Sequence, residues 1–237
     1  LFRSSIIGRG ASSEALAFYR SSKLLFMNKQ PHRTIVYVDG FNFYYGALRG
    51  SKYKWIDLER FFQNVLGEAN EVVGVKYFTA KVSANKSDPE IHHRQEAYLR
   101  ALKKQCPKVE TILGHFLRNK VKAENAKPPP EIVQVWKKEE KGSDVNLAVH
   151  LLNDAWKNEY DCAVVVSNDS DLAESMKLAK LHDKVIGLVT PGAPVRKTSS
   201  QLRQQADFVK PIRRWMFEAS QLPNPIPDTA IHKPDDW

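Results

Sequence analysis

The sequence has few cysteines and no long hydrophobic run. Among its 237 residues only Cys106 and Cys162 carry thiols, which is too few for a disulfide framework and favours a reducing compartment. No apolar run approaches the roughly 18 to 20 residues that a membrane-spanning helix needs. We therefore expect a soluble, cytoplasmic protein that has no membrane partner.

Motifs for several other chemistries are also missing. The adjacent His92 and His93 have no cysteine pair nearby, so a zinc site is not expected. No Gly-Lys-Ser/Thr phosphate loop occurs, which argues against that kind of ATP hydrolysis. A nucleophilic Asp39 of the haloacid-dehalogenase type would need a second aspartate two residues on, where the chain has Phe41. Covalent phosphoryl transfer is therefore disfavoured.

Acidic residues are scarce before Thr34, and much of the positive charge lies there. The chain has 36 Lys and Arg against 27 Asp and Glu, a net charge of +9. Residues 1–33 supply +5 of this, six basic residues minus Glu14, and the remainder carries +4. A surplus of that size fits an anionic substrate and an ordinary surface equally well.

We assign residues 1–33 as a flexible basic N-terminal segment. Three origins compete: an organellar targeting peptide, a disordered basic arm, or sequence upstream of a true start at Met27. We favour the last, because Met27 stands just before the first regular element.

From Thr34 onward short apolar runs alternate with helical patterns, which is typical of βαβ units and a mostly parallel sheet. We predict strands at 34–39, 72–79, 109–116, 162–167, 184–189 and 207–209. We predict helices at 57–66, 89–104, 171–181 and 198–205, and another that begins near Ser143. One α/β domain would therefore span 34–219.

Two segments depart from this alternation. Residues 119–141 carry Lys, Glu and a run of three prolines, so we predict a surface loop followed by a short edge strand at about 132–136. After Ser220 four more prolines argue against a compact continuation. We predict that residues 220–237 form a loose tail.

Four aspartates stand where strands end or a helix begins. Asp39 ends the first strand, and Asp169 and Asp171 follow the strand that ends at Ser167. Asp144 starts the helix that leads into that second strand. The carboxyl edge of a parallel sheet carries the ligand crevice, so we expect these acids to face one pocket. Clustered carboxylates repel one another unless a cation neutralises them, and their oxygens suit Mg²⁺ or Mn²⁺. The pattern indicates metal-assisted phosphodiester hydrolysis.

Each acid also has a purely structural explanation. An aspartate after a strand commonly forms a turn or caps a helix. Asp171 with Glu174 three residues on resembles a capping box, and Ser143 or Asp144 could cap its helix. Two acidic clusters at strand ends, with an acid at the intervening helix start, make the functional interpretation the stronger one.

Three sequence blocks resemble the signature blocks of NYN domains, a PIN-like family that includes the LabA/DUF88-like proteins. The blocks are VDGFN at 38–42, KGSDV at 141–145 and VSNDSDL at 166–172. The resemblance covers about Thr34 to Val209. It implies a Rossmann-like three-layer α/β/α sandwich with a mostly parallel central sheet, and a metal-dependent ribonuclease site.

The resemblance also implies roles for individual residues. Asn42 would orient substrate or a metal-bound water, and Ser167 and Asn168 would shape the pocket. The acidic set would hold Mg²⁺ or Mn²⁺, directly or through water; it consists of Asp39, Asp144, Asp169 and Asp171. Family members without catalysis are also expected, so the resemblance supports a site more firmly than an activity.

A groove for single-stranded RNA would need cations along the phosphates and aromatic rings against the bases. Candidates beside the acidic blocks are Tyr44 and Lys141. Arg196 and Ser199 precede a helix and are candidates for a second anion site, although an ordinary Ser/Thr cap is the better explanation of that pattern.

Our leading hypothesis is a ribonuclease that hydrolyses RNA by a metal-activated water. The alternative is a non-catalytic regulatory module that binds RNA or protein through the same crevice. Phosphatase action on nucleotides, which the same metals would serve, stays open, and so does homo-oligomerisation.

Overall fold

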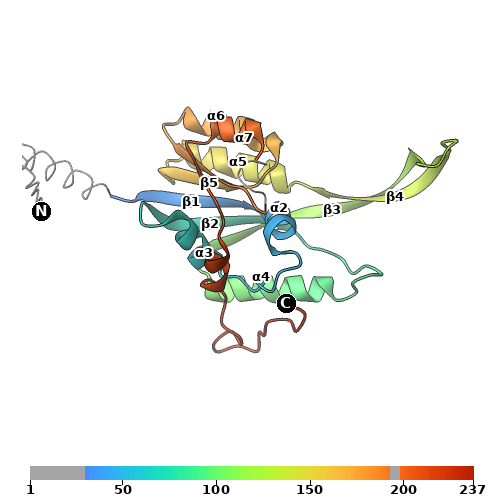
Figure 1. The fold of residues 1–237 in the computed structure, drawn as a ribbon, viewed down its shortest axis with the longest axis horizontal. Helices are drawn as coiled ribbons and strands as arrows, with labels where there is room; N and C mark the ends of the chain where they lie inside the picture. Colours follow the sequence, from blue (N-terminus) through green and yellow to red (C-terminus); the bar gives the residue numbers. More distant parts are fainter. Residues whose placement is uncertain (1–29, 193–197) are drawn as a thin grey trace, which may run out of the picture. The chain divides into compact units, whose positions relative to one another are not determined.

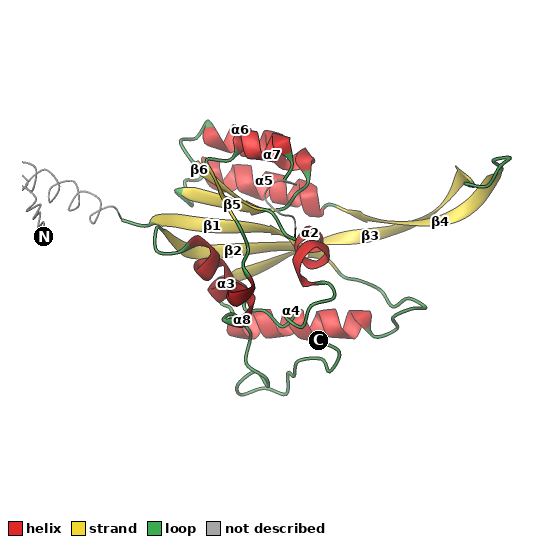
Figure 2. Cartoon of the chain, in the orientation of Figure 1, coloured by secondary structure: helices red, strands yellow, loops and turns green. Residues whose placement is uncertain are grey.

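A computed structural model of the chain describes residues 30–192 and 198–237. Within the folded unit, His32–Trp237, the described residues form one seven-stranded sheet in the order β4-β3-β2-β1-β5-β6-β7 (Figures 1 and 2). The strands are β1 His32–Asp39, β2 Asn70–Ala80, β3 Val109–Glu124, β4 Ile132–Lys141, β5 Cys162–Val166, β6 Val185–Val189 and β7 Phe208–Lys210. All neighbours pair in parallel except β3 and β4, which are antiparallel.

Helices cover both faces of the sheet (Figure 2). The α-helices are α2 Gly40–Phe43, α3 Leu58–Leu66, α4 Ile91–Gln105, α5 Ser143–Trp156, α6 Ala173–Lys180, α7 Ser200–Gln205 and α8 Arg214–Glu218. A π-helical turn, η1, spans Tyr44–Leu48, and a 3₁₀ turn, η2, spans Ser170–Leu172. None of the helices in the described ranges is long and apolar enough to cross a membrane.

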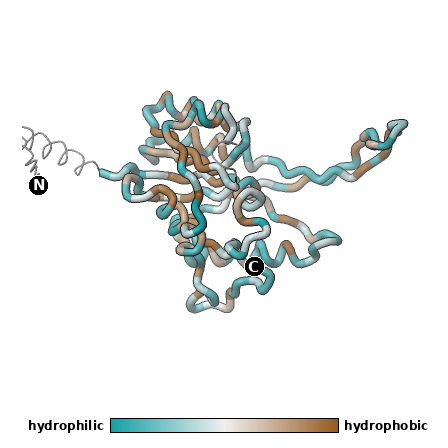
Figure 3. The backbone as a smooth tube through the Cα atoms, in the orientation of Figure 1, coloured by the Kyte–Doolittle hydropathy of each residue, from teal (hydrophilic) through white to brown (hydrophobic). Residues whose placement is uncertain are grey.

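Strand β1 shows how the sequence builds the two layers. Its side chains alternate between faces: Val36 and Val38 join a core with the α3, α4 and α8 side chains, whereas Ile35 and Tyr37 join a second core with α5, α6 and α7. Because both faces are covered, the central strands carry apolar runs, which appear as brown central segments in Figure 3. The predicted three-layer sandwich with a mostly parallel sheet is confirmed.

The strand order reverses at β1, and this positions the site. Strands β2 and β3 continue on one side of β1, while β5 to β7 lie on the other. The pairing of β1 with β5 ends at Val38 opposite Val166, so the residues after both strands emerge side by side. Such a switch point opens a crevice at the carboxyl edge of a parallel sheet.

The edge strand predicted at about 132–136 is present as part of β4, which is longer, but the surface loop predicted before it is shorter than expected because β3 continues to Glu124. Strands β3 and β4 instead form a two-stranded arm that pairs from His115 with Lys141 to Glu124 with Ile132, and it extends beyond the helical layers in Figure 1. We call residues 115–141 the arm. Most of its side chains are solvent-exposed, so it lacks the buried apolar positions by which a strand is recognised in sequence.

The prediction of a loose tail at 220–237 was also wrong. Leu222 and Ile226 are buried, the Leu222 N–H donates to the carbonyl of Trp55 (2.9 Å), and the Trp237 ring lies 6.4 Å from that of Trp55. Proline removes a backbone donor but does not prevent side-chain packing, which is why the proline content misled the prediction.

The predicted N-terminal boundary shifts by two residues. Strand β1 begins at His32, and Arg33 pairs with Asp161 at 2.9 Å, so the end of the predicted flexible segment belongs to the sheet. The rest of that prediction, with Met27, concerns residues 1–29, which lie outside the described residues.

Candidate active site

Asp39 is the last residue of β1 and is almost fully buried, with 5% of its surface exposed. Its Oδ1 accepts a hydrogen bond from the backbone N–H of Asn42 (2.9 Å), which caps α2, and its Oδ2 accepts one from the hydroxyl of Ser167 (2.9 Å). Burial raises the pKa of Asp39; these hydrogen bonds oppose the shift, and the charge of Asp169 adds to it. The hydrogen bonds thus hold the carboxylate in place, but its charged form remains disfavoured by burial and by the charge of Asp169.

The glycine after Asp39 is required by space. A Cβ at Gly40 would stand 2.6 Å from the carbonyl oxygen of Phe78. Glycine therefore allows the chain to turn from β1 into α2 against the neighbouring strand, and this turn places Asn42 beside the Asp39 carboxylate.

Hydrogen bonds connect the loop after β5 to the loop after β1. The Ser167 hydroxyl accepts from the Asp169 N–H (3.0 Å) while donating to Asp39. The Asn42 side-chain oxygen accepts from the Asn168 N–H (3.2 Å). Asp169 Oδ1 accepts from the Asp171 N–H (3.0 Å) and so caps η2. The first and third motif blocks therefore form one connected structure.

Asp144 reaches the same place from the start of α5. Gly142 precedes the helix with φ +98°, a left-handed conformation that favours glycine. Glu140, the penultimate residue of β4, caps the helix: its Oε1 accepts from the Ser143 N–H (3.2 Å) and hydroxyl (2.7 Å). The capping carboxylate thus comes from Glu140, which leaves the Asp144 carboxylate outside this cap.

Asp144 lies close enough to the other acids for their charges to affect its pKa. Desolvation raises the pKa of Asp144 to about 6, and negative charges around it add to the shift. Those charges belong to Asp39, Asp169, Glu140 and Asp171. Among the described residues no ion pair reaches Asp39 or Asp144, so no cation in that part of the chain offsets their mutual repulsion.

The donor set fits a hard divalent ion that keeps several waters. Within residues 30–192 and 198–237, no three acidic, His or Cys side chains are placed closely enough to enclose an ion by themselves. Mg²⁺ commonly takes only one or two carboxylates and completes its shell with water and substrate phosphate. A set of carboxylates in which the pKa values of Asp39 and Asp144 are raised, with no cation paired to either in the described part of the chain, suits that mode of binding.

The structure brings only some of the predicted substrate residues to the cluster. The backbone N–H of Ser199 donates to Asn168 Oδ1 (2.8 Å), so Ser199 lies against the third block. Lys141 is exposed and pairs with Glu139 (3.3 Å). Tyr44 lies in η1 and lines a neighbouring cavity. Arg196 lies outside the described residues.

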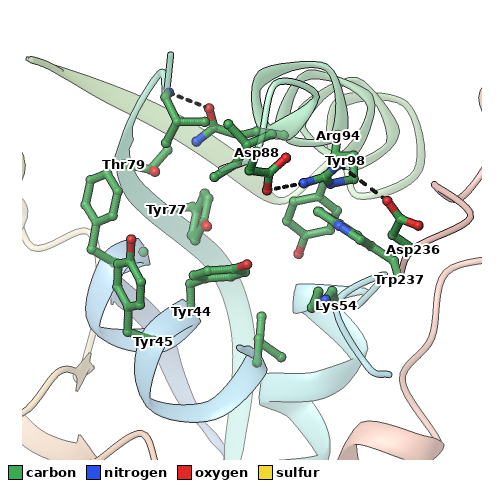
Figure 4. A pocket seen from close by; sticks show the side chains of 16 residues that line it. Tyr44, Tyr45, Lys54, Tyr77, Thr79, Asp88, Arg94, Tyr98, Asp236 and Trp237 are labelled. Carbon is green, nitrogen blue, oxygen red and sulfur yellow. Dashed lines mark hydrogen bonds and ion pairs between the residues drawn. The ribbon is translucent and has the colours of Figure 1, made fainter. Parts of the chain in front are cut away.

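That cavity, of about 190 Å³, begins at Gly40 and Phe41, directly after Asp39. Figure 4 shows its aromatic walls, which come from segments far apart in the chain; they are Tyr44, Tyr45, Tyr77, Tyr98 and Trp237. Arg94 at its rim is paired with Asp88 and, at 3.6 Å, with Asp236.

Sequence reasoning missed Glu140 and most of this cavity. Glu140 joins the cluster only through the register of the arm, and Trp237 reaches the cavity only through the packing of the tail. Trp237 has no local sequence signal for this role. For Glu140 the one available signal is its position four residues before Asp144.

Comparison with known proteins decides the family. A family model described as NYN domain matches residues 33–212, which include the carboxylate cluster. The chain belongs to the NYN domain family. The three blocks that converge in space are thus those of an NYN domain, and the family is PIN-like.

Two individual proteins are similar to this NYN domain protein. The 6-hydroxy-3-succinoylpyridine 3-monooxygenase HspA of Pseudomonas putida (strain DSM 28022 / S16) is 34% identical over 247 residues, covering 89% of this chain and 77% of the relative. A solved structure of a protein of unknown function from Vibrio parahaemolyticus RIMD 2210633 has a TM-score of 0.47 and 19% identity, covering 79% of this chain and 96% of the other.

Proposed function

We propose that this NYN domain protein is a metal-dependent ribonuclease that hydrolyses RNA phosphodiester bonds. The observation that carries the proposal is the carboxylate cluster: Asp39 is hydrogen-bonded to the loop that carries Asp169, and the charges of the first and third sequence blocks, with that of Glu140, act on Asp144 of the second block. The family supports it, because NYN domains are PIN-like nucleases. Mg²⁺ or Mn²⁺ would be held by Asp39, Asp144, Asp169 and Asp171.

When bound, such an ion neutralises charge on phosphoryl oxygens and lowers the pKa of water. The chain itself supplies position. Ser167 and the Asn42 N–H hold the Asp39 carboxylate in a fixed orientation. The Asn42 and Asn168 side chains act as positioning residues, because each accepts a backbone hydrogen bond from a different loop: Asn42 from Asn168, and Asn168 from Ser199.

The experiment is cleavage of a labelled single-stranded RNA with Mn²⁺ or with EDTA. Wild type should cleave only with metal and release 5′-phosphate products. Asp39→Asn and Asp169→Asn should not cleave, whereas Glu71→Gln, an exposed acid at the amino end of β2, should cleave normally. Tight RNA binding without products would instead support a non-catalytic regulatory module, and full cleavage by Asp39→Asn would refute the proposed role of the cluster.

A second candidate function rests on the monooxygenase relative and on the aromatic cavity. A 34% identity over 89% of the chain, with a ring-lined cavity beside Asp39, favours binding and hydroxylation of a small heteroaromatic acid. Lys54 lines the cavity, and an ammonium there suits a carboxylate group.

The discriminating measurement is turnover of 6-hydroxy-3-succinoylpyridine in air with a reduced nicotinamide and flavin. Hydroxylated product that is lost in Lys54→Gln, together with no RNA cleavage by wild type, would establish the second function and overturn the first. If a calorimetric titration showed no binding of this compound, the second candidate function would be rejected.

A further inference from the structure

The β3–β4 arm has two faces that differ in charge. Residues that pair across an antiparallel ladder point to the same face, and every second residue shares that face. The observed pairs Arg118 with Lys138, Lys120 with Trp136, and Lys122 with Gln134 therefore place four cations and an indole on one side. We call this the cationic face.

The cations of this face lie around two aromatic rings, the exposed Trp136 and the half-buried Phe116. Trp136 is 56% exposed, with the Arg118 guanidinium 4.4 Å and the Lys120 ammonium 5.1 Å from its ring centroid. The Lys138 ammonium lies 4.4 Å from the centroid of the Phe116 ring. No acidic side chain pairs with these cations among the described residues, although like charges placed opposite one another destabilise a ladder.

On the opposite face two lysines share one carboxylate. Lys137 and Lys141 both pair with Glu139, and the three residues alternate along β4 on that side. Lys137 and Lys138 are thus neighbours of equal charge on different faces, one paired with a carboxylate and the other not.

The cationic face continues into the carboxylate cluster. The Phe116 ring meets that of Phe41 at 5.8 Å, two residues beyond Asp39. Glu140 pairs with Phe116 in the ladder, so it lies on the same face, and its charge acts on Asp144. The surface therefore runs from the exposed indole to the acids without changing side.

We propose that the cationic face of the arm binds single-stranded RNA and leads it into the carboxylate cluster. Arg118, Lys120 and Lys122 are spaced about 7 Å apart along the strand and contact successive phosphates. Trp136 stacks on an unpaired base, which a duplex would not offer. The inference rests on the proposed ribonuclease function, since it names how the substrate of that site is held.

Binding is measured apart from cleavage, by fluorescence anisotropy of a labelled 12-nucleotide RNA in EDTA. Lys138→Gln should weaken binding and lower the slope of log affinity against log salt by about 0.7, while the matched control Lys137→Gln leaves both unchanged. Combining Arg118→Gln, Lys120→Gln and Lys138→Gln should lower that slope by about 2. Equal effects of Lys137→Gln and Lys138→Gln would overturn the proposal.

The indole gives a second readout that does not depend on charge. Trp136→Ala should weaken binding about tenfold, whereas Trp136→Phe keeps a stacking ring and most of the affinity but loses RNA-dependent quenching of tryptophan fluorescence. Unchanged affinity in Trp136→Ala, with a circular dichroism spectrum like that of wild type, would contradict stacking.

The two proposals fail in different ways. RNA binding that depends on the cationic face, without metal-dependent cleavage, would support the proposed RNA-binding surface and contradict the proposed ribonuclease activity. If wild type cleaved RNA and the triple variant bound RNA as tightly as wild type, the ribonuclease proposal would stand and the proposed RNA-binding surface would be contradicted. If the triple variant differed from wild type in oligomeric state but bound RNA equally well, the arm would be assigned to contacts with a second copy of the chain, and the proposal would be overturned.

Discussion

Asp39 serves the fold as well as the proposed chemistry. Its two oxygens accept hydrogen bonds from Asn42 and Ser167, so a replacement can remove the charge, the cap, or both. An amide of the same shape keeps an oxygen for the Asn42 N–H, and the Ser167 hydroxyl can rotate to accept from the amide nitrogen.

We therefore expect Asp39→Asn to unfold at the same urea concentration as the metal-free wild type, or at a higher one, because a buried charge with a raised pKa is removed. Asp39→Ala should lose about 1 to 2 kcal/mol of unfolding free energy, because the cap and a buried hydrogen bond disappear. Equilibrium urea denaturation measures both. If Asp39→Asn had a lower unfolding free energy than Asp39→Ala, this account of the site would be contradicted.

Asp144 makes stability depend on pH in the metal-free protein. Its pKa is about 6 in the folded chain and about 3.9 when unfolded, so between these values the folded state binds more protons. The contribution of Asp144 to the unfolding free energy then falls as pH rises from 4 to 6.

The expected contribution of Asp144 to this fall is about 1 kcal/mol, because solvent screening reduces the effect at a partly exposed side chain. Asp144→Asn should remove it and be more stable than wild type at pH 7 in EDTA, with the two proteins equal near pH 4. Urea titrations at both pH values test this. A variant less stable than wild type at pH 7 would show that repulsion does not dominate at Asp144.

At the scale of elements, α5 carries Asp144 and is fixed to the sheet by a buried polar cluster. Asp154 on α5 is 4% exposed; its Oδ2 accepts from the Tyr37 hydroxyl (2.7 Å) and pairs with Lys76 (2.6 Å). The His150 ring lies 3.3 Å from the same ammonium. This cluster joins α5 to β1 and β2, the strands beside the site.

Lys76→Met should lower the unfolding free energy by about 3 kcal/mol, because it leaves the Asp154 carboxylate buried without its cation. Adding Asp154→Asn removes that charge, so the double variant should be more stable than Lys76→Met alone. Chemical denaturation of the four proteins of this cycle gives the coupling between the two residues. A double variant that is less stable by the sum of both single losses would contradict the ion pair.

Elements were predictable where they bury a face. The run CAVVV of β5 is buried at every position and was predicted to within one residue, and the amphipathic α3 likewise. The length of the arm was not predictable, because its strands are held by pairing between residues 115–124 and 132–141 with little burial. The acids at strand ends were expected to converge by topology alone, and they do, whereas their roles stay predictions.

At the scale of the whole molecule, the tail completes the layer that contains α3 and α4. Leu222 and Ile226 are buried, and Trp237 packs against Trp55 and Tyr98. The Trp55 indole N–H donates to the carbonyl of Pro223 (3.0 Å). These contacts join residues more than 130 positions apart, and for that reason composition alone did not show them.

Deleting residues 222–237 should lower the unfolding free energy by about 4 kcal/mol or more, since burial of each large aliphatic side chain contributes about 1.5 to 3 kcal/mol and Trp55 becomes exposed. The tryptophan emission of the folded truncated protein should shift to longer wavelength. As a full-length control, Ile226→Ala should show a smaller loss without that shift. Unchanged stability on truncation would mean that the tail does not pack as described.

The central claim is that carboxylates from three sequence blocks act as a single cation site. The most direct test is Mn²⁺ binding, followed through the electron paramagnetic resonance signal of the free ion. We expect saturable binding by wild type and Glu71→Gln, and loss of that binding in Asp39→Asn and in Asp169→Asn, with all four proteins folded. Wild-type Mn²⁺ binding by both Asp39→Asn and Asp169→Asn would contradict the claim.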